Sequence, residues 1–415
     1  MLPSGLDDNA VMICTIRRHR RTQGSLFMPT VAWIDDRERF RAIASAWNSL
    51  APGSPCLRHE WLDAWWEAYG DGCELRIGWV TDDQGEPIGG LPLLRQSTVP
   101  HGRLLRLLGS GAACSDGVGV LASAGRESET VDALAAALTC PTPARSPSVR
   151  WDEWDWDGVA ATDASTAALI DKVRGEATRT RECGQMSTWR MNFPSAPFEP
   201  FSLASSKTQR KFRRLAKSFE SGDMVLNCAT DAASFERGER ILIELHQKRR
   251  QSLGEPGCFA DPRFERFYRA ATASLFHRGL WRIYWIEYQG TPIGVQSGSF
   301  LDNIFFSYQT GLEPAAFDRE PGWLVQIGLL RTAAAQGWTA IDYMRGDEPY
   351  KATLGCKPTP VRRIRLCHSR FSARSRFALY HLARDAKHWW DSVPNSLPSL
   401  PAATAFNGVA ATEKP

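Results

Sequence analysis

The chain has 415 residues, of which 43% are hydrophobic and 23% charged, and this composition is typical of a globular protein. Because a single hydrophobic core rarely contains so many residues, we expect two domains. The net charge of +4 is too small to indicate a nucleic-acid-binding or membrane-binding protein by itself. Ten cysteines occur singly, without zinc-type spacing, which predicts reduced thiols and no metal site. With neither a bilayer-length apolar stretch nor a signal peptide, a cytoplasmic location is expected.

The first half begins with a polar, Arg-rich tail over residues 1–30 that we expect to be disordered. Two helical patterns follow, and the second carries Trp61, Trp65 and Trp66 on one face until Gly70 ends it. The hydrophobic period then changes to two, which predicts strands over 75–79 and 87–94 joined by a polar turn. A strand over 104–108, a helix over 127–138 and a strand over 149–156 complete this half.

The strand-turn-strand unit occurs twice. Its first copy is Arg76-Ile77-Gly78-Trp79, Gln84-Gly85 and Pro87-Ile88-Gly89, and its second copy is Arg282-Ile283-Tyr284-Trp285, Gln289-Gly290 and Pro292-Ile293-Gly294. Each copy follows helices and precedes a strand, a helix and a strand, over 304–308, 323–335 and 340–344 in the second half. Duplication of one domain explains this order better than chance. The sequence therefore predicts an α/β (α+β) protein of two tandem copies, each a mixed sheet flanked by helices.

A run rich in Pro and Ser separates the two copies. We therefore predict a first domain over 31–191, a linker over 192–206 and a second domain over 207–368. A basic helix over 369–392 and a disordered tail over 393–415 are expected to follow.

The densest candidate for chemistry is the segment 342–351, with the sequence Asp-Tyr-Met-Arg-Gly-Asp-Glu-Pro-Tyr-Lys, just past a predicted strand. Its carboxylates, cations and phenol can serve as a base, bind an anion and protonate a leaving group. A solvated turn with internal ion pairs explains the same residues, and their spacing does not decide between the two.

Three other features are weaker candidates. Gly322 and Trp323 open a predicted helix, where backbone N–H groups suit a phosphate, although a plain turn is the commoner meaning. A basic stripe on another helix fits a nucleotide phosphate, an RNA backbone or a solvated face; it comprises Lys207, Arg210, Lys211, Arg214 and Lys217. His246, on a helix over 236–251, fits a general base or a hydrogen-bonded structural histidine.

No Gly-x-Ser-x-Gly, Walker, dinucleotide-binding or His-Glu-x-x-His motif occurs, which leaves hydrolase, kinase and zinc-enzyme functions without support. From about Val31 to Arg365 the chain resembles the FemAB-like and CelD-like (cellulose biosynthesis protein CelD) two-domain branch of the GNAT acyltransferases. The resemblance is carried by Glu60-Trp61-Leu62 with Trp65-Trp66, residues 205–215, Leu245-His246 with Arg249, Pro262-Arg263, Gly290 with Pro292-Ile293, Pro321-Gly322 and, most specifically, residues 345–351.

The resemblance implies transfer of an acyl group from acetyl-CoA or a longer acyl-CoA, by direct attack of an amine on the thioester. The acceptor would be a sugar, a peptide, a polysaccharide or peptidoglycan precursor, or another small amine. Because no counterpart of residues 345–351 occurs in the first half, that domain is expected to be degenerate and to act as scaffold. One active site per chain follows.

Roles are assigned under this resemblance by residue type. The catalytic candidates are Asp342 or Asp347 as the carboxylate for the amine, Tyr350 as proton donor and His246 as base. The substrate-binding candidates are Arg345, Glu348 and Lys351, with Trp65 and Trp66 as a wall of the acceptor groove. The cofactor-binding candidates are Gly322, Trp323, Lys207, Arg210 and Lys211.

Two alternatives stay open. One is a Fem-like transferase that uses aminoacyl-tRNA, with the basic helix holding RNA, and the other is a non-catalytic polysaccharide-binding or assembly protein. The small net charge and the lack of a long coiled-coil insertion favour acyl-CoA, so nucleic acid is not the expected partner.

Overall fold

The computed structural model describes residues 29–51, 53–139, 149–175 and 177–392. The tail expected over 393–415 lies outside the described residues, as do residues 1–28 of the tail expected at the N-terminus. Within the described residues no helix is long and apolar enough to cross a membrane.

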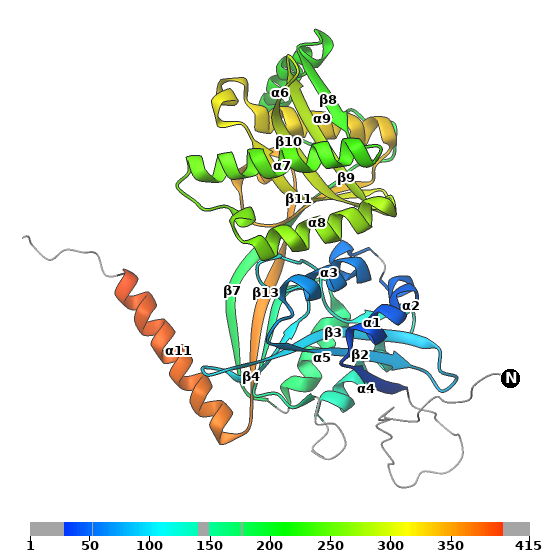
Figure 1. Ribbon diagram of the computed structural model, residues 1–415, viewed down its shortest axis with the longest axis vertical. Helices are drawn as coiled ribbons and strands as arrows, with labels where there is room; N and C mark the ends of the chain where they lie inside the picture. The colour runs from blue at the N-terminus through cyan, green and yellow to red at the C-terminus, as the bar shows by residue number, and fades with distance from the viewer. Residues whose placement is uncertain (1–28, 52, 140–148, 176, 393–415) are drawn as a thin grey trace, which may run out of the picture.

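The first half runs from β1 to β7 (Figure 1). Its elements are β1 (Thr30–Ile34), α1 (Arg37–Ala42), α2 (Ala44–Ser49), η1 (Pro55–Leu57), α3 (His59–Tyr69), β2 (Cys73–Thr81), β3 (Pro87–Thr98), β4 (Gly102–Leu107), β5 (Leu121–Ala122), α4 (Glu127–Thr139), β6 (Glu153–Ala160), α5 (Ala164–Arg174) and β7 (Ala177–Asn192). The strand expected over 149–156 begins later than predicted, and the first expected helix is divided at Ile43 into α1 and α2.

The second half repeats this order. Its elements are α6 (Ser206–Glu220), β8 (Met224–Cys228), α7 (Ala232–Ser252), η3 (Cys258–Ala260), α8 (Pro262–His277), β9 (Trp281–Tyr288), β10 (Thr291–Leu301), β11 (Ile304–Leu312), η4 (Pro314–Arg319), α9 (Pro321–Gln336), β12 (Ala340–Arg345), α10 (Pro349–Leu354) and β13 (Lys357–His368). The basic helix α11 (Phe371–Ser392) follows.

Strand pairing confirms the duplication. In the first half β2, β3 and β4 are antiparallel neighbours and β4 lies parallel to β6. In the second half β9, β10 and β11 are antiparallel neighbours and β11 lies parallel to β12. The turn between β10 and β11 consists of Asp302 and Asn303, which both adopt positive φ. A two-residue hairpin turn requires this conformation, and Asp and Asn tolerate it better than most residues.

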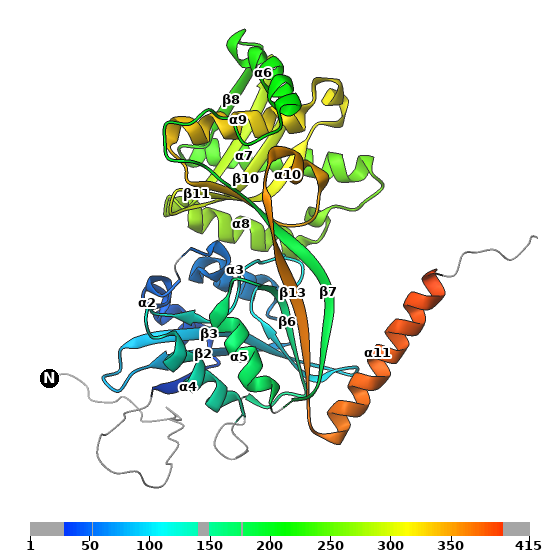
Figure 2. The same ribbon diagram turned by 180° about the vertical axis from the view of Figure 1, so that it is seen from behind.

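The two halves exchange their last strands. β13 pairs with β6 of the first half and with β7, and β7 pairs with β12 of the second half. The result is one continuous mixed sheet, in which β7 and β13 are long strands running between the halves (Figure 2). The division at 191, 207 and 368 stays a prediction, and the pairing of β13 with β6 crosses it.

Aromatic packing also joins the halves. Trp61 of α3 is 1% exposed, and its ring meets those of Phe267 on α8 and Tyr308 on β11 edge-on, with centroids 4.9 and 5.0 Å apart. Edge-to-face pairs of this kind add about 0.5–1.5 kcal/mol each beyond the burial of apolar area. This packing holds the first half firmly against the strand that borders the candidate site.

Candidate active site

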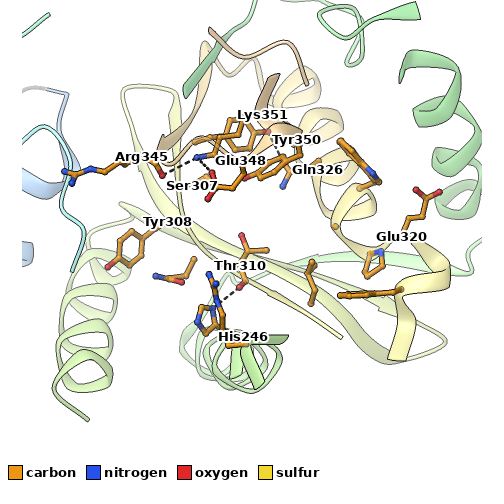
Figure 3. A pocket seen from close by; sticks show the side chains of 18 residues that line it. His246, Ser307, Tyr308, Thr310, Glu320, Gln326, Arg345, Glu348, Tyr350 and Lys351 are labelled. Carbon is orange, nitrogen blue, oxygen red and sulfur yellow. Dashed lines mark hydrogen bonds and ion pairs between the residues drawn. The ribbon is translucent and has the colours of Figure 1, made fainter. Parts of the chain in front are cut away.

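A pocket of about 600 Å³ opens where β11 and β12 separate (Figure 3). Among the described residues the two parallel strands pair only from Ile304–Phe306 to Ala340–Asp342. Beyond that point β11 borders the pocket through residues 307–312, and the start of α9, the segment 343–351 and part of α7 form the other walls. Strands that diverge leave backbone polar groups facing the space between them, so the pocket can hold an extended ligand with amide groups.

The start of α9 faces this pocket through Gly322. Glu320 caps the helix in the left-handed conformation (φ 58°), and Pro321 occupies the first turn, where its fixed φ suits a helix start. A Cβ atom at Gly322 would meet no atom closer than Leu312 Cδ1 at 3.5 Å. The backbone here is open to a ligand, and a helix N-terminus favours an anionic one.

Cations from α6 reach the rim of the pocket. The Glu320 carboxylate, which lines the pocket, pairs with Lys211 and, at 3.2 Å, with Arg214. The Lys211 Nζ atom also lies 5.2 Å from the centre of the Trp323 ring. The structure thus brings Lys211 beside Gly322 and Trp323, whereas Lys207 and Arg210 are exposed. None of the three cations lines the pocket itself.

Lys351 holds the segment 345–351 in shape. Its side chain is 3% exposed, its Nζ donates to the carbonyls of Gly346 (2.9 Å) and Arg345 (3.3 Å), and it pairs with Glu348 at 2.8 Å. Gly346 has a φ of 121°, which strongly favours glycine. Lys351 lines the pocket, and its charge is paired inside the protein; that it binds a ligand anion stays a prediction.

Arg345 is directed toward the first half. Its backbone N–H and its Nε both donate to Asp116 at 2.7 Å, and its Nη1 donates to Asp157 at 3.0 Å. Figure 3 shows the side chain pointing away from the pocket that it borders. Two carboxylates neutralise this guanidinium, which ties the segment to the first half. The anion-binding role of Arg345 stays a prediction.

The carboxylates are not placed as expected. The Asp342 Oδ1 accepts a hydrogen bond from the Met344 N–H at 2.8 Å, and burial raises the pKa of Asp342. Asp347 is exposed and accepts from Trp189 Nε1 at 2.9 Å. Neither lines the pocket, whereas Glu348, half-exposed, does. Glu348 is the carboxylate of this segment that a bound amine can reach.

Tyr350 lines the pocket as expected of a proton donor. Burial raises its pKa far above the ordinary value for a phenol, so it carries its proton at neutral pH. Its ring meets that of Tyr343 edge-on at 6.0 Å, and the Tyr343 hydroxyl donates to Gln326 at 2.7 Å. This packing fixes the orientation of Tyr350.

His246 also lines the pocket, and both of its ring nitrogens have partners. Nδ1 lies 3.1 Å from the Thr310 carbonyl oxygen, to which it donates, and Nε2 lies 3.2 Å from Cys258 Sγ. Burial lowers the pKa of His246, so the ring is neutral at pH 7 and Nε2 accepts from the thiol. No sequence pattern indicated that Cys258 would be the partner of His246.

The wall contributed by the first half is not the expected one. Trp65 is buried in the core against Tyr69, Trp66 packs against the same core, and neither lines the pocket. Instead the connection between β4 and α4 reaches the second half, where the Ala113 carbonyl accepts from the Tyr308 hydroxyl at 2.8 Å. Tyr308 and Asp116 belong to no motif, so sequence reasoning missed both.

Comparison with known proteins supports the assignment. Residues 206–352, less than half of the chain, match the family of acetyltransferase (GNAT) domains. The solved structure of FemX is similar with a TM-score of 0.54 and 11% identity, covering 78% of this chain and 95% of FemX. No curated protein matches in sequence.

Two further solved structures are similar with TM-scores below 0.5. A conserved protein of unknown function from Bacteroides thetaiotaomicron has a TM-score of 0.49 and 11% identity, covering 81% of this chain and 99% of its own. A tandem GNAT protein from the clavulanic acid biosynthesis pathway has a TM-score of 0.43 and 13% identity, covering 82% and 98%. Residues 206–352 thus match the family of acetyltransferase (GNAT) domains, and most of the chain shares the fold of FemX.

Proposed function

We propose that this protein transfers an acyl group from an acyl-CoA thioester to an acceptor amine in the pocket between β11 and β12. The observation that carries the proposal is the separation of these two parallel strands beside the open start of α9. An extended pantetheine arm with its amide groups fits the space between diverging strands. The pyrophosphate fits the helix start at Gly322, with the α6 cations Lys211 and Arg214 at the rim.

The bound thioester supplies an activated acyl carbon, and the residues of the pocket supply positioning and proton transfer. Glu348 holds the acceptor amine and takes up its proton as the new C–N bond forms. Tyr350, which keeps its proton at neutral pH, donates it to the sulfur as the C–S bond breaks. His246 is neutral and fixes the end of β11 through Thr310.

The same geometry defines what the first half does in this proposal. Asp116 and Asp157 hold Arg345, which begins the segment that carries Glu348 and Tyr350. The first half therefore positions the reacting side chains and supplies none of them.

Turnover of acetyl-CoA and longer acyl-CoA thioesters with a panel of amino sugars and peptide amines, followed by free thiol release, tests the proposal. Tyr350→Phe should lower kcat by about a hundredfold or more, the range for loss of a general acid. Tyr288→Phe, a tyrosine of β9 outside the pocket, is the matched control and should leave kcat unchanged. Full turnover by Tyr350→Phe, or a thermal shift with aminoacyl-tRNA and none with acyl-CoA, would count against it.

A further inference from the structure

Helix α11 presents large apolar side chains to solvent. Phe371 is 84% exposed, Leu379 66% and Leu382 69%. At 100° per residue these three fall within one 80° sector of the helix. Both views show α11 standing away from the body of the protein beyond the end of β13 (Figures 1 and 2).

The opposite side of α11 holds it to the fold. Ala373, Phe377 and His381, at i, i+4 and i+8, are buried, and Phe377 and Ala373 pack with Cys367 of β13. The exposed apolar sector is thus directed away from the packed side, with the two centres about 150° apart around the helix. A helix with apolar side chains on two sides is stabilised when both sides are buried. Within the residues that the structure describes, only one side of α11 is packed against the protein.

The helix and the residue before it are also rich in positive charge. Residues 370–392 contain five cations (Arg370, Arg374, Arg376, Arg384 and Lys387) and two carboxylates (Asp385 and Asp391), a net charge of +3. Asp385 is already paired with Arg181 of β7 at 2.8 Å. Arg374, beside Phe371 on the exposed surface, flanks the apolar sector.

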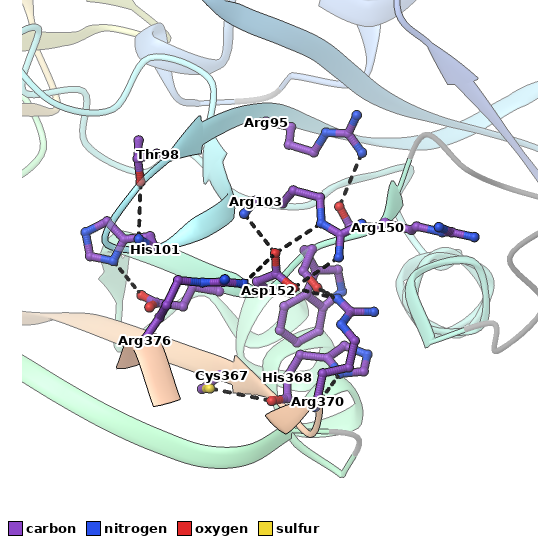
Figure 4. Close-up of polar contacts among 12 residues, drawn as sticks. Arg95, Thr98, His101, Arg103, Arg150, Asp152, Cys367, His368, Arg370 and Arg376 are labelled. Atoms are coloured by element: carbon purple, nitrogen blue, oxygen red, sulfur yellow. Dashed lines mark hydrogen bonds and ion pairs between the residues drawn. The ribbon is translucent and has the colours of Figure 1, made fainter. Parts of the chain in front are cut away.

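The start of α11 is anchored by one carboxylate that several arginines share (Figure 4). Asp152, which is 3% exposed, accepts from Arg103 at 3.1 Å and from Arg370 at 3.0 Å, and Arg376 lies 3.5 Å from it. Three guanidinium groups around one carboxylate leave an excess of positive charge at this end of the helix. Each of the three side chains is about one-third exposed, so the excess charge faces solvent.

We propose that α11 is an interfacial helix that binds the surface of an anionic lipid bilayer, with Phe371, Leu379 and Leu382 inserted below the headgroups. Apolar residues on one side of a surface helix with cations beside them are what such binding requires. A second copy of the chain is disfavoured as the occupant because two segments with a net charge of +3 would face each other. The helix lies on the membrane and does not span it, in keeping with its composition.

Co-flotation of the full-length protein with vesicles tests this proposal. Vesicles of phosphatidylcholine with phosphatidylglycerol are compared with vesicles of phosphatidylcholine alone, at low and at high salt. The wild type should float with the anionic vesicles, more weakly at high salt, and Leu379→Gln with Leu382→Gln should reduce the bound fraction about tenfold or more. Arg374→Gln should weaken binding to the anionic vesicles only.

The matched control is Val225→Gln with Leu253→Gln, which removes two apolar side chains of 49% and 50% exposure elsewhere and should float like the wild type. Circular dichroism checks that each variant is folded. Three results would overturn the proposal: no flotation of the wild type, equal binding to neutral vesicles, or equal loss in the control pair. A dimer in light scattering that the Leu379 and Leu382 substitutions dissociate, without vesicle binding, would assign the surface to a second copy instead.

Discussion

Replacing Asp116 by Ala should destabilise the protein more than any comparable change of a surface carboxylate. Its side chain is 8% exposed and accepts two hydrogen bonds of 2.7 Å from the backbone and Nε of Arg345. Its removal leaves a mostly buried guanidinium short of a partner and one backbone N–H without its acceptor. A buried pair broken in this way costs about 3–5 kcal/mol.

Two other carboxylates give the scale for that loss. Asp157 is 26% exposed and accepts one bond of 3.0 Å from Arg345, so Asp157→Ala should cost about 1 kcal/mol. Asp171 is 72% exposed and lies 3.7 Å from Arg174, so Asp171→Ala should cost less than about 0.5 kcal/mol. The expected order is Asp116, then Asp157, then Asp171.

Urea unfolding at pH 7, followed by circular dichroism, measures the three midpoints, with Asp116→Asn as a milder variant that keeps one acceptor. Turnover is measured alongside, and Asp116→Ala should lose activity because Arg345 begins the segment that carries Tyr350. If Asp116→Ala and Asp171→Ala unfolded at the same urea concentration, the role given to Arg345 in joining the halves would be wrong.

Three further outcomes are expected. Gly322→Val should leave the melting temperature almost unchanged, because its Cβ would make only an ordinary contact with Leu312 Cδ1 at 3.5 Å, but it should raise the Kd for acyl-CoA in calorimetry. An unchanged affinity would place the phosphate site elsewhere. Burial lowers the pKa of His246 in the folded protein, so as the pH falls the unfolded chain takes up the proton first. The stability difference between wild type and His246→Gln should therefore be full above about pH 6.5 and shrink below it. Chemical denaturation at several pH values measures this difference. Burial raises the pKa of Asp152, but hydrogen bonds from Arg103 lower it by more, so that it falls to about 2. The ionised carboxylate therefore contributes roughly 2 kcal/mol to the free energy of unfolding above about pH 4. The stability difference between wild type and Asp152→Asn should shrink as the pH falls from 4 toward 2. A constant difference would contradict the pairing.

Local signals made the repeated fold predictable. Gln289 and Gly290 both adopt positive φ in the turn between β9 and β10, and Gly85 does so in the turn between β2 and β3. Turn chemistry of this kind lies within a few neighbouring residues, so it is readable in the sequence. The alternation of apolar residues beside each turn then indicates the strands that it joins.

The exchange of β7 and β13 was not predictable in the same way. Both strands pair with partners far away in the chain, as in Leu366 with Trp154 and Arg345 with Thr188. The sequence of a strand shows that it is a strand, but not which distant strand it pairs with. A prediction made in chain order therefore assigns each strand to the half that is nearer in sequence. The predicted division places β7 in the first half and β13 in the second, and each of these strands pairs across it.

The densest motif of the sequence lies beside the pocket, but the partners of its side chains could not be predicted. Residues 345–351 do border the pocket, yet Arg345 pairs with Asp116, 229 residues earlier. A charged side chain in a motif shows that an interaction exists, but its partner depends on tertiary structure. For the same reason Trp65 and Trp66 could not be assigned to core or groove from their helical spacing alone.

Hydrogen–deuterium exchange with and without acetyl-CoA tests the central claim most directly, which is that only the second half holds the acyl donor. Protection is expected at residues 307–312 of β11 and at the start of α9, and not at the corresponding end of β4 or the start of α4. Protection at β4 and α4, or no protection anywhere at saturating acetyl-CoA, would contradict it.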